Sequence, residues 1–557
     1  MAERGKMQGM LKYELRHSHS GHGVAFFAPV PVQAVDLFEA VDLLAARPMD
    51  TFLHQHCLGL IRGLGDDDLR SLADRWPQPP GLTLVAEASL LDGREGLAPP
   101  EWPSMTSSSP LMILRHFALN DRGLHKAWSV RFRENIFEHR PLSGSRRELE
   151  VLTAGTEIRQ GPSPAEVWKR RATRPESVKR PSAAQVYAAA MERLYGYGIV
   201  TGPEMRHQAS LAPCGMQRQW NMAVNVESGL VRYKFEGLMT SYGRGLSWEE
   251  ARVSLAMEIV ERASSFAGVK NGMVSGLRQP TALIQARHSE LTAQGRLALD
   301  PGLLRTEVPY ADEELHWMPA QDVRGNEVLI PFQIVFLFAD LGEVCLFGGL
   351  GSTGLASGST MAGARLRGLL EVLERDADAV TPFDPNRCFR VETDDPVLGP
   401  LLADYEDRGV HVRFQDMTTE FGLPCYRAFV VGQDGNVVQA AGAGLDGRRA
   451  LVSALTEVAW PYPDGPASAP GLSDLPVTRI EDLPNFSTGD SAQDLEFLEE
   501  MLTGWGYEPV YADLTRADLR LPVARAVVPG LEIACDFDRF SRISPRLVKR
   551  AFSLLSA

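Results

Sequence analysis

The motif Glu-x-x-Glu-Arg occurs twice in this chain, at 258–262 and 371–375, and this repetition constrains the fold more than any other feature. Each copy lies towards the end of a long amphipathic helical pattern, at roughly 247–265 and roughly 359–380. Residues three and four apart share one face of a helix, so each helix is predicted to present two carboxylates on one stripe. The remaining surface of both helices is largely apolar, which predicts that they pack against a sheet.

The segments around these helices indicate an α/β (α+β) fold with mixed sheets and packed helices. Runs of β-branched and aromatic residues predict strands at 82–91, 220–226, 230–243, 328–338, 343–349, 410–417, 425–432, 436–442 and 524–535. A third helix is expected at 447–460, and it carries Ser453 and Glu457 four residues apart.

A chain of 557 residues is too long for one ordinary core, so several domains are expected. Residues 1–160 are predicted to form a separate, smaller α/β N-terminal domain of unknown function. The basic, proline-containing segment 161–182 is interpreted as a linker. Residues 183–557 then form the main domain, which contains both motifs.

Charge and hydropathy exclude several classes of partner. The formal net charge of -14 argues against a nucleic-acid-binding surface. The sequence has no stretch of eighteen unbroken apolar residues, so no membrane span is predicted and we expect a cytoplasmic protein. Six cysteines without any C-x-x-C spacing indicate reduced thiols.

Four carboxylates that converge in a protein interior must be balanced by cations. Mg²⁺ prefers oxygen ligands and commonly bridges carboxylates to nucleotide phosphates, and arginine binds phosphate through two parallel hydrogen bonds. The two helices therefore predict a site for ATP and Mg²⁺ that lacks a glycine-rich phosphate loop. A single motif would be explained as well by an ordinary solvated helix face, but two copies on apolar helices favour a ligand site.

The glycines at 349–354 offer an alternative, because they formally match the dinucleotide-binding fingerprint. In that fingerprint the helix begins inside the glycine-rich turn, whereas here the helical pattern starts only near Met361. A nicotinamide-dependent oxidoreductase is therefore the weaker interpretation.

From about Lys179 to the carboxyl end the chain resembles the YcaO family. The resemblance is carried by the two blocks SYGRGLSWEEARVSLAMEIVERAS at 241–264 and TGLASGSTMAGARLRGLLEVLERDA at 353–377. Further similar stretches lie at 316–331, 442–459 and 524–532. The resemblance implies ATP- and Mg²⁺-dependent modification of peptide backbone amides. In this reaction a nucleophile attacks the amide carbonyl, the resulting oxygen is phosphorylated, and phosphate leaves to give an azoline or a thioamide.

The resemblance also implies roles for individual residues and partners. Metal binding falls to Glu258, Glu261, Glu371 and Glu374. Nucleotide contacts fall to Lys179, Ser254, Arg262, Ser359, Arg367 and Arg375. The expected partners are a peptide or protein substrate and a sulfur-transfer or accessory protein, and a homodimer is left open.

Some residues depart from the family pattern. Ser359, Gly363 and Arg367 stand where the family usually has Asn, an acidic residue, and His or Gln. Ser453 and Trp460 surround Glu457 where an Arg and a Gln are usual. These departures favour thioamidation or an accessory role over azoline formation. The alternative function is a degenerate, non-catalytic YcaO scaffold or an accessory factor to a ribosomal-protein methylthiotransferase. Arg367 is expected either to reach phosphate or to form a salt bridge with Glu371.

Overall fold

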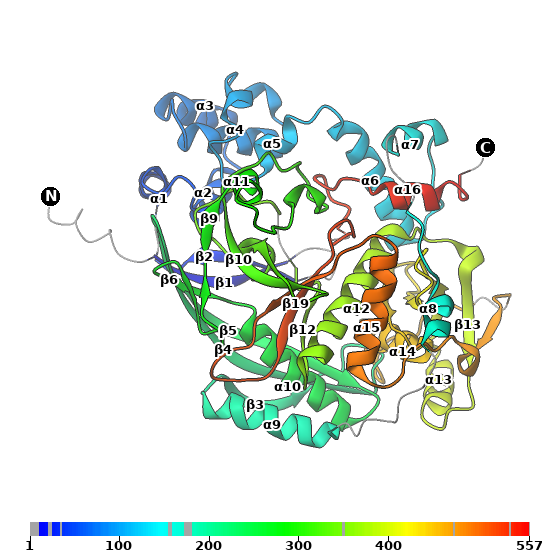
Figure 1. The fold of residues 1–557 in the computed structure, drawn as a ribbon. Coiled ribbons are helices and arrows are strands. Elements are labelled where there is room, and N and C mark those ends of the chain that lie inside the picture. The colour runs from blue at the N-terminus through cyan, green and yellow to red at the C-terminus, as the bar shows by residue number, and fades with distance from the viewer. Residues whose placement is uncertain are drawn as a thin grey trace.

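The computed structural model describes residues 11–19, 25–33, 36–153, 159–171, 181–347, 351–471, 474–533 and 536–555. These residues form a mixed α/β protein with three sheets, with helices packed against the sheets (Figure 1). Lys179 lies outside the described residues. Within the described residues no helix is both long enough and apolar enough to cross a membrane.

The first sheet is built on a long antiparallel hairpin. Its strands are β1 (Leu11–His19), β2 (Ala25–Pro31), β3 (Val200–Arg206), β4 (Cys214–Ser228), β5 (Val231–Gly245), β6 (Gly268–Lys270), β7 (Met273–Ser275) and β8 (Thr281–Ala282). The hairpin pairs Cys214 with Gly245 at one end and Ser228 with Val231 at the other. Trp220 and Met222 of β4 are buried while Asn221 and its alternate neighbours are exposed, the period of two expected for a sheet with one covered face.

The other two sheets are smaller. The second contains β9 (Ile284–Ala286), β10 (Leu315–Asp322), β11 (Glu327–Pro331), β12 (Leu355–Ser357), β18 (Val510–Asp513) and β19 (Val523–Val527). The third contains β13 (Cys388–Glu392), β14 (Arg413–Asp416), β15 (Cys425–Val431), β16 (Val437–Ala443) and β17 (Val477–Arg479).

Three helices, one for each sheet, carry the residues singled out by the sequence. They are α10 (Trp248–Ser264) on β4 and β5, α12 (Met361–Val380) on β12 and β19, and α14 (Gly447–Glu457) on β15 and β16 (Figure 1). The remaining helices are α1 (Leu37–Ala45), α2 (Thr51–Ile61), α3 (Asp66–Arg75), α4 (Gly81–Leu91), α5 (Ile113–Phe117), α6 (Arg122–Glu138), α7 (Arg146–Leu152), α8 (Pro164–Arg170), α9 (Ala183–Gly196), α11 (His288–Ala293), α13 (Leu398–Asp407), α15 (Ser491–Gly504) and α16 (Pro545–Ala551).

At three glycines, the backbone of one of these helices lies in direct contact with the backbone of the strand or turn that it packs against. A Cβ atom on Gly243 of β5 would lie 2.2 Å from the carbonyl oxygen of Ala251 in α10. A Cβ on Gly442 of β16 would lie 2.2 Å from the carbonyl oxygen of Ala450 in α14. Gly368 of α12 meets a backbone carbonyl oxygen at 2.5 Å in the same way. A side chain at any of these positions would overlap backbone atoms and force the helix away from the segment that it packs against.

The N-terminal residues share the first sheet and its core with later parts of the chain. Strand β1 pairs in parallel with β5, and buried residues of α1, α2 and α4 belong to the same apolar cluster as those of β4, β5 and α10. A separate N-terminal domain is therefore not shown, and the boundaries predicted at 160 and 182 stay predictions. The predicted linker includes helix α8, whose Val167 packs into a core with α12 and α15.

Several of the predicted strands are wrong in part or in full, including the one predicted at 524–535, which ends at Val527. Residues 82–91 belong to helix α4, which is buried along its whole length, and a helix that is apolar all round has no periodicity to distinguish it from a buried strand. The strand predicted at 328–338 ends at Pro331, where a 3₁₀ turn begins. Residues 343–347 pass through bends without forming a strand.

The backbone contact at Gly243 yields a direct test. Gly243→Ala is expected to lower the free energy of unfolding by about 1–3 kcal/mol, because the new methyl group overlaps the backbone of α10. Urea denaturation measures the effect. Gly237→Ala is the matched control on the same strand, since a Cβ there meets no atom within 4 Å. Equal stability of the two variants would contradict the packing described.

Candidate functional site

Helix α10 brings the first motif to its C-terminal half. Ser247 caps the helix by accepting a hydrogen bond from the Glu250 backbone N–H at 3.2 Å. Within the motif, Arg262 Nε lies 3.9 Å from Glu258 Oε1, and Arg262 Nη1 lies 3.2 Å from Glu261 Oε1. The arginine thus sits between the two carboxylates of its own helix.

Helix α12 presents the second motif in a similar arrangement. Thr360 caps the helix by accepting from the Gly363 N–H at 3.1 Å. Arg375 Nη2 lies 3.5 Å from Glu374 Oε1, and Glu374 Oε2 accepts from the backbone N–H of Ala443 at 3.3 Å. Because Ala443 ends strand β16, the third sheet also reaches this site.

The two helices place their carboxylates close enough to repel each other. Burial raises the pKa of Glu261 to about 8, and the charges of Glu371 and Glu258 add to the rise against the opposing effect of Arg262. Burial raises the pKa of Glu374 to about 8 in the same way, with Glu457 and Glu371 adding to the rise against Arg375. The pKa values of Glu258 and Glu371 are also raised, first by burial. The four predicted glutamates therefore form one electrostatic cluster.

Strands and helices elsewhere in the chain supply three further charged residues: Glu457, which the sequence analysis noted on the third helix without assigning it to the site, and Arg244 and Arg525, which it did not select. Glu457 ends helix α14 and lies 3.6 Å from Arg244 Nη2, which comes from the end of β5. Arg525 of β19 is fully buried, and its pKa is lowered to about 10 by burial, with Arg262 adding to the fall, although Glu371 and Glu261 act in the opposite direction. These residues are far apart in the sequence, so no sequence pattern groups them. Only the contact between the three sheets brings them together.

Arg525 and Arg262 retain buried hydrogen-bond donors. Arg525 Nη2 donates to the Gly351 carbonyl at 3.0 Å, while its Nε and Nη1 have no hydrogen-bond partner among the described residues. Arg262 Nη1 makes an ion pair with Glu261, but it also lacks an aligned hydrogen bond within this set. Unmet donors on buried cations suit an anionic ligand such as phosphate, because leaving them unpaired is costly.

The remaining predicted contacts lie around the cluster or away from it. Ser254 lies one turn before Glu258 on α10 and is partly buried, and Ser359 is exposed just before the cap of α12. Arg367 Nη1 donates to the carbonyl of Ser357 at 3.2 Å, and Ser357 Oγ donates in turn to the Met257 carbonyl at 2.8 Å. Arg367 thus joins α12 to β12, which is itself bonded to α10.

The cluster is not a ready-made metal cage. Among the residues that the structure describes, no three His, Cys, Asp or Glu side chains are grouped so that they could hold one metal ion. Mg²⁺ usually binds through one or two carboxylates together with phosphate oxygens and waters, so a preformed protein cage is not required. The donor set of partly buried carboxylates beside partly buried Arg262 and Arg375 and fully buried Arg525 fits Mg²⁺ together with a polyphosphate.

Comparison with known proteins identifies the class. The family model described as YcaO cyclodehydratase, ATP- and Mg²⁺-binding, matches residues 242–465 and 459–532, which together span more than half of the chain. The chain therefore belongs to the YcaO family. The match includes all four glutamates, Arg525 and Glu457, and it starts within β5.

Two curated relatives are described as uncharacterized proteins. A protein from Methanothermobacter thermautotrophicus is 30% identical over 346 residues, which cover 55% of this chain and 86% of the relative. An "uncharacterized protein in tfuA 3'region" from Rhizobium leguminosarum bv. trifolii is 30% identical over 236 residues, which cover 39% of this chain and 53% of that protein.

Solved structures resemble the fold at low sequence identity. A heterocyclase in complex with substrate and cofactor has a TM-score of 0.48 at 21% identity, over 64% of this chain and 55% of that one. The heterocyclase TruD has a TM-score of 0.41 at 22% identity, over 53% of this chain and 47% of that one. The YcaO protein from Methanopyrus kandleri, bound with AMPPCP and Mg²⁺, has a TM-score of 0.46 at 21% identity, over 67% and 97%. The chain spans about half the length of each heterocyclase.

The raised pKa of Glu261 makes the stability of the ligand-free protein depend on pH. A pKa of about 8 in the folded state, above the ordinary value of 4.5, means that only the folded state holds this proton between these pH values. Stability is therefore expected to fall as the pH rises from about 4.5 to about 8. Glu261→Gln cannot ionise, so its unfolding midpoint should exceed that of the wild type at pH 8 by about 1–3 °C, and the difference should shrink at pH 5.

Thermal unfolding in Mg²⁺-free buffer at both pH values measures this difference. Glu249→Gln serves as the control, because Glu249 is exposed in the first turn of the same helix and should not change the pH dependence. A Glu261→Gln protein with the same pH dependence as the wild type would show that Glu261 is not held protonated.

Proposed function

We propose that this protein binds ATP and Mg²⁺ at the cluster formed by α10, α12 and α14 and uses them to activate peptide backbone amides. One observation carries the proposal. Two partly buried Glu-x-x-Glu-Arg motifs, 113 residues apart in the chain, form a single cluster in which burial and mutual repulsion raise the pKa of Glu261 and Glu374 to about 8. Such a cluster is destabilising by itself and becomes favourable when divalent cations bind.

The described residues divide into two chemical groups under this proposal. Glu258, Glu261, Glu371 and Glu374 are the ligands for Mg²⁺. The guanidinium groups of Arg262, Arg375 and Arg525 bind phosphate oxygens, and their fixed charges stabilise the negative charge that develops during transfer. Ser254, Ser359, Arg367 and Lys179 complete the contacts to the nucleotide.

When bound, ATP supplies the phosphoryl group that converts an amide oxygen into a good leaving group. The chain's own residues hold the phosphates in place, on helices α10, α12 and α14 that each pack on one of the three sheets. The substrate is a peptide or protein amide, and the product is a thioamide or an azoline. Ser359, Gly363 and Arg367 favour the thioamide, which requires a sulfur-transfer protein as partner.

A second candidate function is a non-catalytic YcaO scaffold or an accessory factor to a methylthiotransferase. It is favoured by the roles of the residues that depart from the family pattern. Arg367 is bonded to the Ser357 carbonyl, and Trp460 is buried with its Nε1 donating to the Pro466 carbonyl at 3.0 Å. Both residues thus serve the packing of the fold.

Nucleotide binding tests the proposal and separates the two candidates. The wild type is expected to unfold at a higher temperature with millimolar ATP and Mg²⁺, since a ligand at about 100 times its Kd stabilises a protein by about 2.7 kcal/mol. Glu371→Gln combined with Glu374→Gln should abolish the shift and Mg²⁺-dependent ATP hydrolysis, because it removes two of the four metal ligands. Thermal unfolding and phosphate release are the measurements.

The matched control is Glu192→Gln combined with Glu249→Gln, because both glutamates are exposed on helices away from the cluster. This control should behave as the wild type. A wild type that is not stabilised by millimolar ATP and Mg²⁺ would favour the scaffold, and an unchanged shift in the Glu371/Glu374 variant would place nucleotide binding elsewhere.

A further inference from the structure

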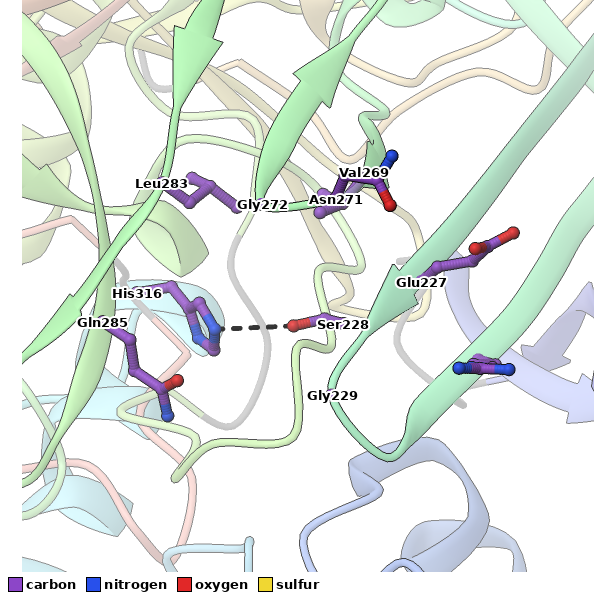
Figure 2. A pocket seen from close by; sticks show the side chains of 10 residues that line it. Glu227, Ser228, Gly229, Val269, Asn271, Gly272, Leu283, Gln285 and His316 are labelled. Carbon is purple, nitrogen blue, oxygen red and sulfur yellow. Dashed lines mark hydrogen bonds between the residues drawn. The ribbon is translucent and has the colours of Figure 1, made fainter.

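A cavity of about 380 Å³ lies at the turn between β4 and β5, outside the carboxylate cluster (Figure 2). Its lining comes from the hairpin turn, from the β6–β7 turn and from strands β9 and β10. The lining residues are Glu227, Ser228, Gly229, Arg232, Val269, Asn271, Gly272, Leu283, Gln285 and His316. A volume of this size is within the range of small-molecule sites.

A serine, a histidine and a glutamate form a hydrogen-bonded chain at the wall of this cavity. Ser228 Oγ lies 3.4 Å from His316 Nε2, as the dashed line in Figure 2 shows. On the other side of the ring, His316 Nδ1 lies 2.7 Å from Glu343 Oε2. The three residues come from β4, β10 and the segment after β11, so only the tertiary fold brings them together.

The network fixes the tautomer of the imidazole. Glu343 Oε2 also accepts from the His316 backbone N–H at 2.6 Å, and Glu343 Oε1 accepts from Gln333 Nε2 at 2.8 Å. Gln333 is held in turn, because its Oε1 accepts from the Leu346 N–H at 2.7 Å. A carboxylate only accepts, so the ring proton is on Nδ1, and the lone pair of Nε2 faces the serine hydroxyl.

We propose that Ser228, His316 and Glu343 are the nucleophile, the general base and the positioning carboxylate of a site that hydrolyses small carboxylic esters. Ser228 Oγ bonds to the ester carbonyl carbon while its proton passes to His316 Nε2. The bond from the carbonyl carbon to the alkoxy oxygen then breaks, and His316 Nε2 gives the proton to this oxygen, so that an alcohol leaves. Water then attacks the acyl-serine, giving its proton to His316, and the carboxylic acid is released as the proton returns to Ser228 Oγ.

The surroundings of Ser228 suit this chemistry. Gly229 follows the nucleophile and lines the cavity. Under this proposal its backbone N–H is the oxyanion donor, the role that the residue after the nucleophile has in other serine hydrolases. Val269 and Leu283 provide an apolar wall for the acyl chain, while Asn271 and Gln285 provide polar groups. A distance of 3.4 Å between hydroxyl and imidazole is typical of a site without substrate, where such bonds are loose.

This site is independent of the carboxylate cluster. Val231, opposite Ser228 in the hairpin, is separated along β5 by eleven residues from Tyr242, whose backbone bonds to Glu258. At about 3.3 Å per residue the two positions are roughly 35 Å apart along the strand. Ester hydrolysis is therefore expected without ATP or Mg²⁺, and its failure would leave the proposed amide activation unaffected.

The test uses the full-length protein, a fluorophosphonate probe and p-nitrophenyl acetate. The wild type should be phosphonylated at Ser228, as located by peptide mass spectrometry, and should hydrolyse the ester in the absence of nucleotide. Ser228→Ala should lose the label and reduce hydrolysis by about 100-fold or more, and His316→Gln should slow both by about 100-fold. Glu343→Gln should lower kcat and leave KM unchanged, because Glu343 orients the base and does not touch the ester.

Ser275→Ala is the matched control, since Ser275 is exposed on the neighbouring strand β7 and does not line the cavity. It should retain full labelling at Ser228 and full hydrolysis. The proposal is overturned if Ser228 of the wild type is not labelled, or if Ser228→Ala hydrolyses the ester at the wild-type rate. Because Ser228→Ala removes only one partly exposed hydroxyl, circular dichroism should show that it stays folded even if His316→Gln does not.

Discussion

The fold is arranged around the repulsion between buried carboxylates on facing helices. Glu258 and Glu261 on α10 and Glu371 and Glu374 on α12 share one region with Glu457 of α14, and burial raises the pKa of the first four. The protein offsets this cost only in part, with arginines from α10, α12, β5 and β19. The packing of the three helices on the three sheets keeps these charges together. Favourable packing elsewhere in the molecule must offset the part of the electrostatic cost that the arginines leave.

The sequence could predict the part of this site that is local. The two motifs and the apolar stripes lie within single helices, where a period of 3.6 residues relates neighbours in the chain to neighbours in space. Arg525 and Arg244 could not be selected in this way. Each lies in a strand, where an arginine is ordinarily a solvated residue, and its role depends on a sheet contact with a helix far away in sequence.

The wrong strand predictions at 82–91 and 343–347 have a cause related to this one. Helix α4 is buried on all sides, so its sequence shows no alternation that could indicate its geometry. The segment with Glu343 is apolar like a strand, but its backbone bends so that the carboxylate reaches His316. A chain of Ser228, His316 and Glu343 is invisible in sequence, because three unrelated positions with unrelated spacing carry it.

The glycines beneath the three helices have a consequence for ligand selectivity. At Gly243, Gly368 and Gly442 hard contacts between backbone atoms set the distance between helix and support, so substitutions in the apolar core cannot change that distance without unfolding. The width of the carboxylate cluster is therefore a property of the backbone. Ser359 is exposed at the rim and is not one of these contact positions. A substitution at such a rim position is expected to change what the site accepts and to leave the arrangement of charges inside it unchanged.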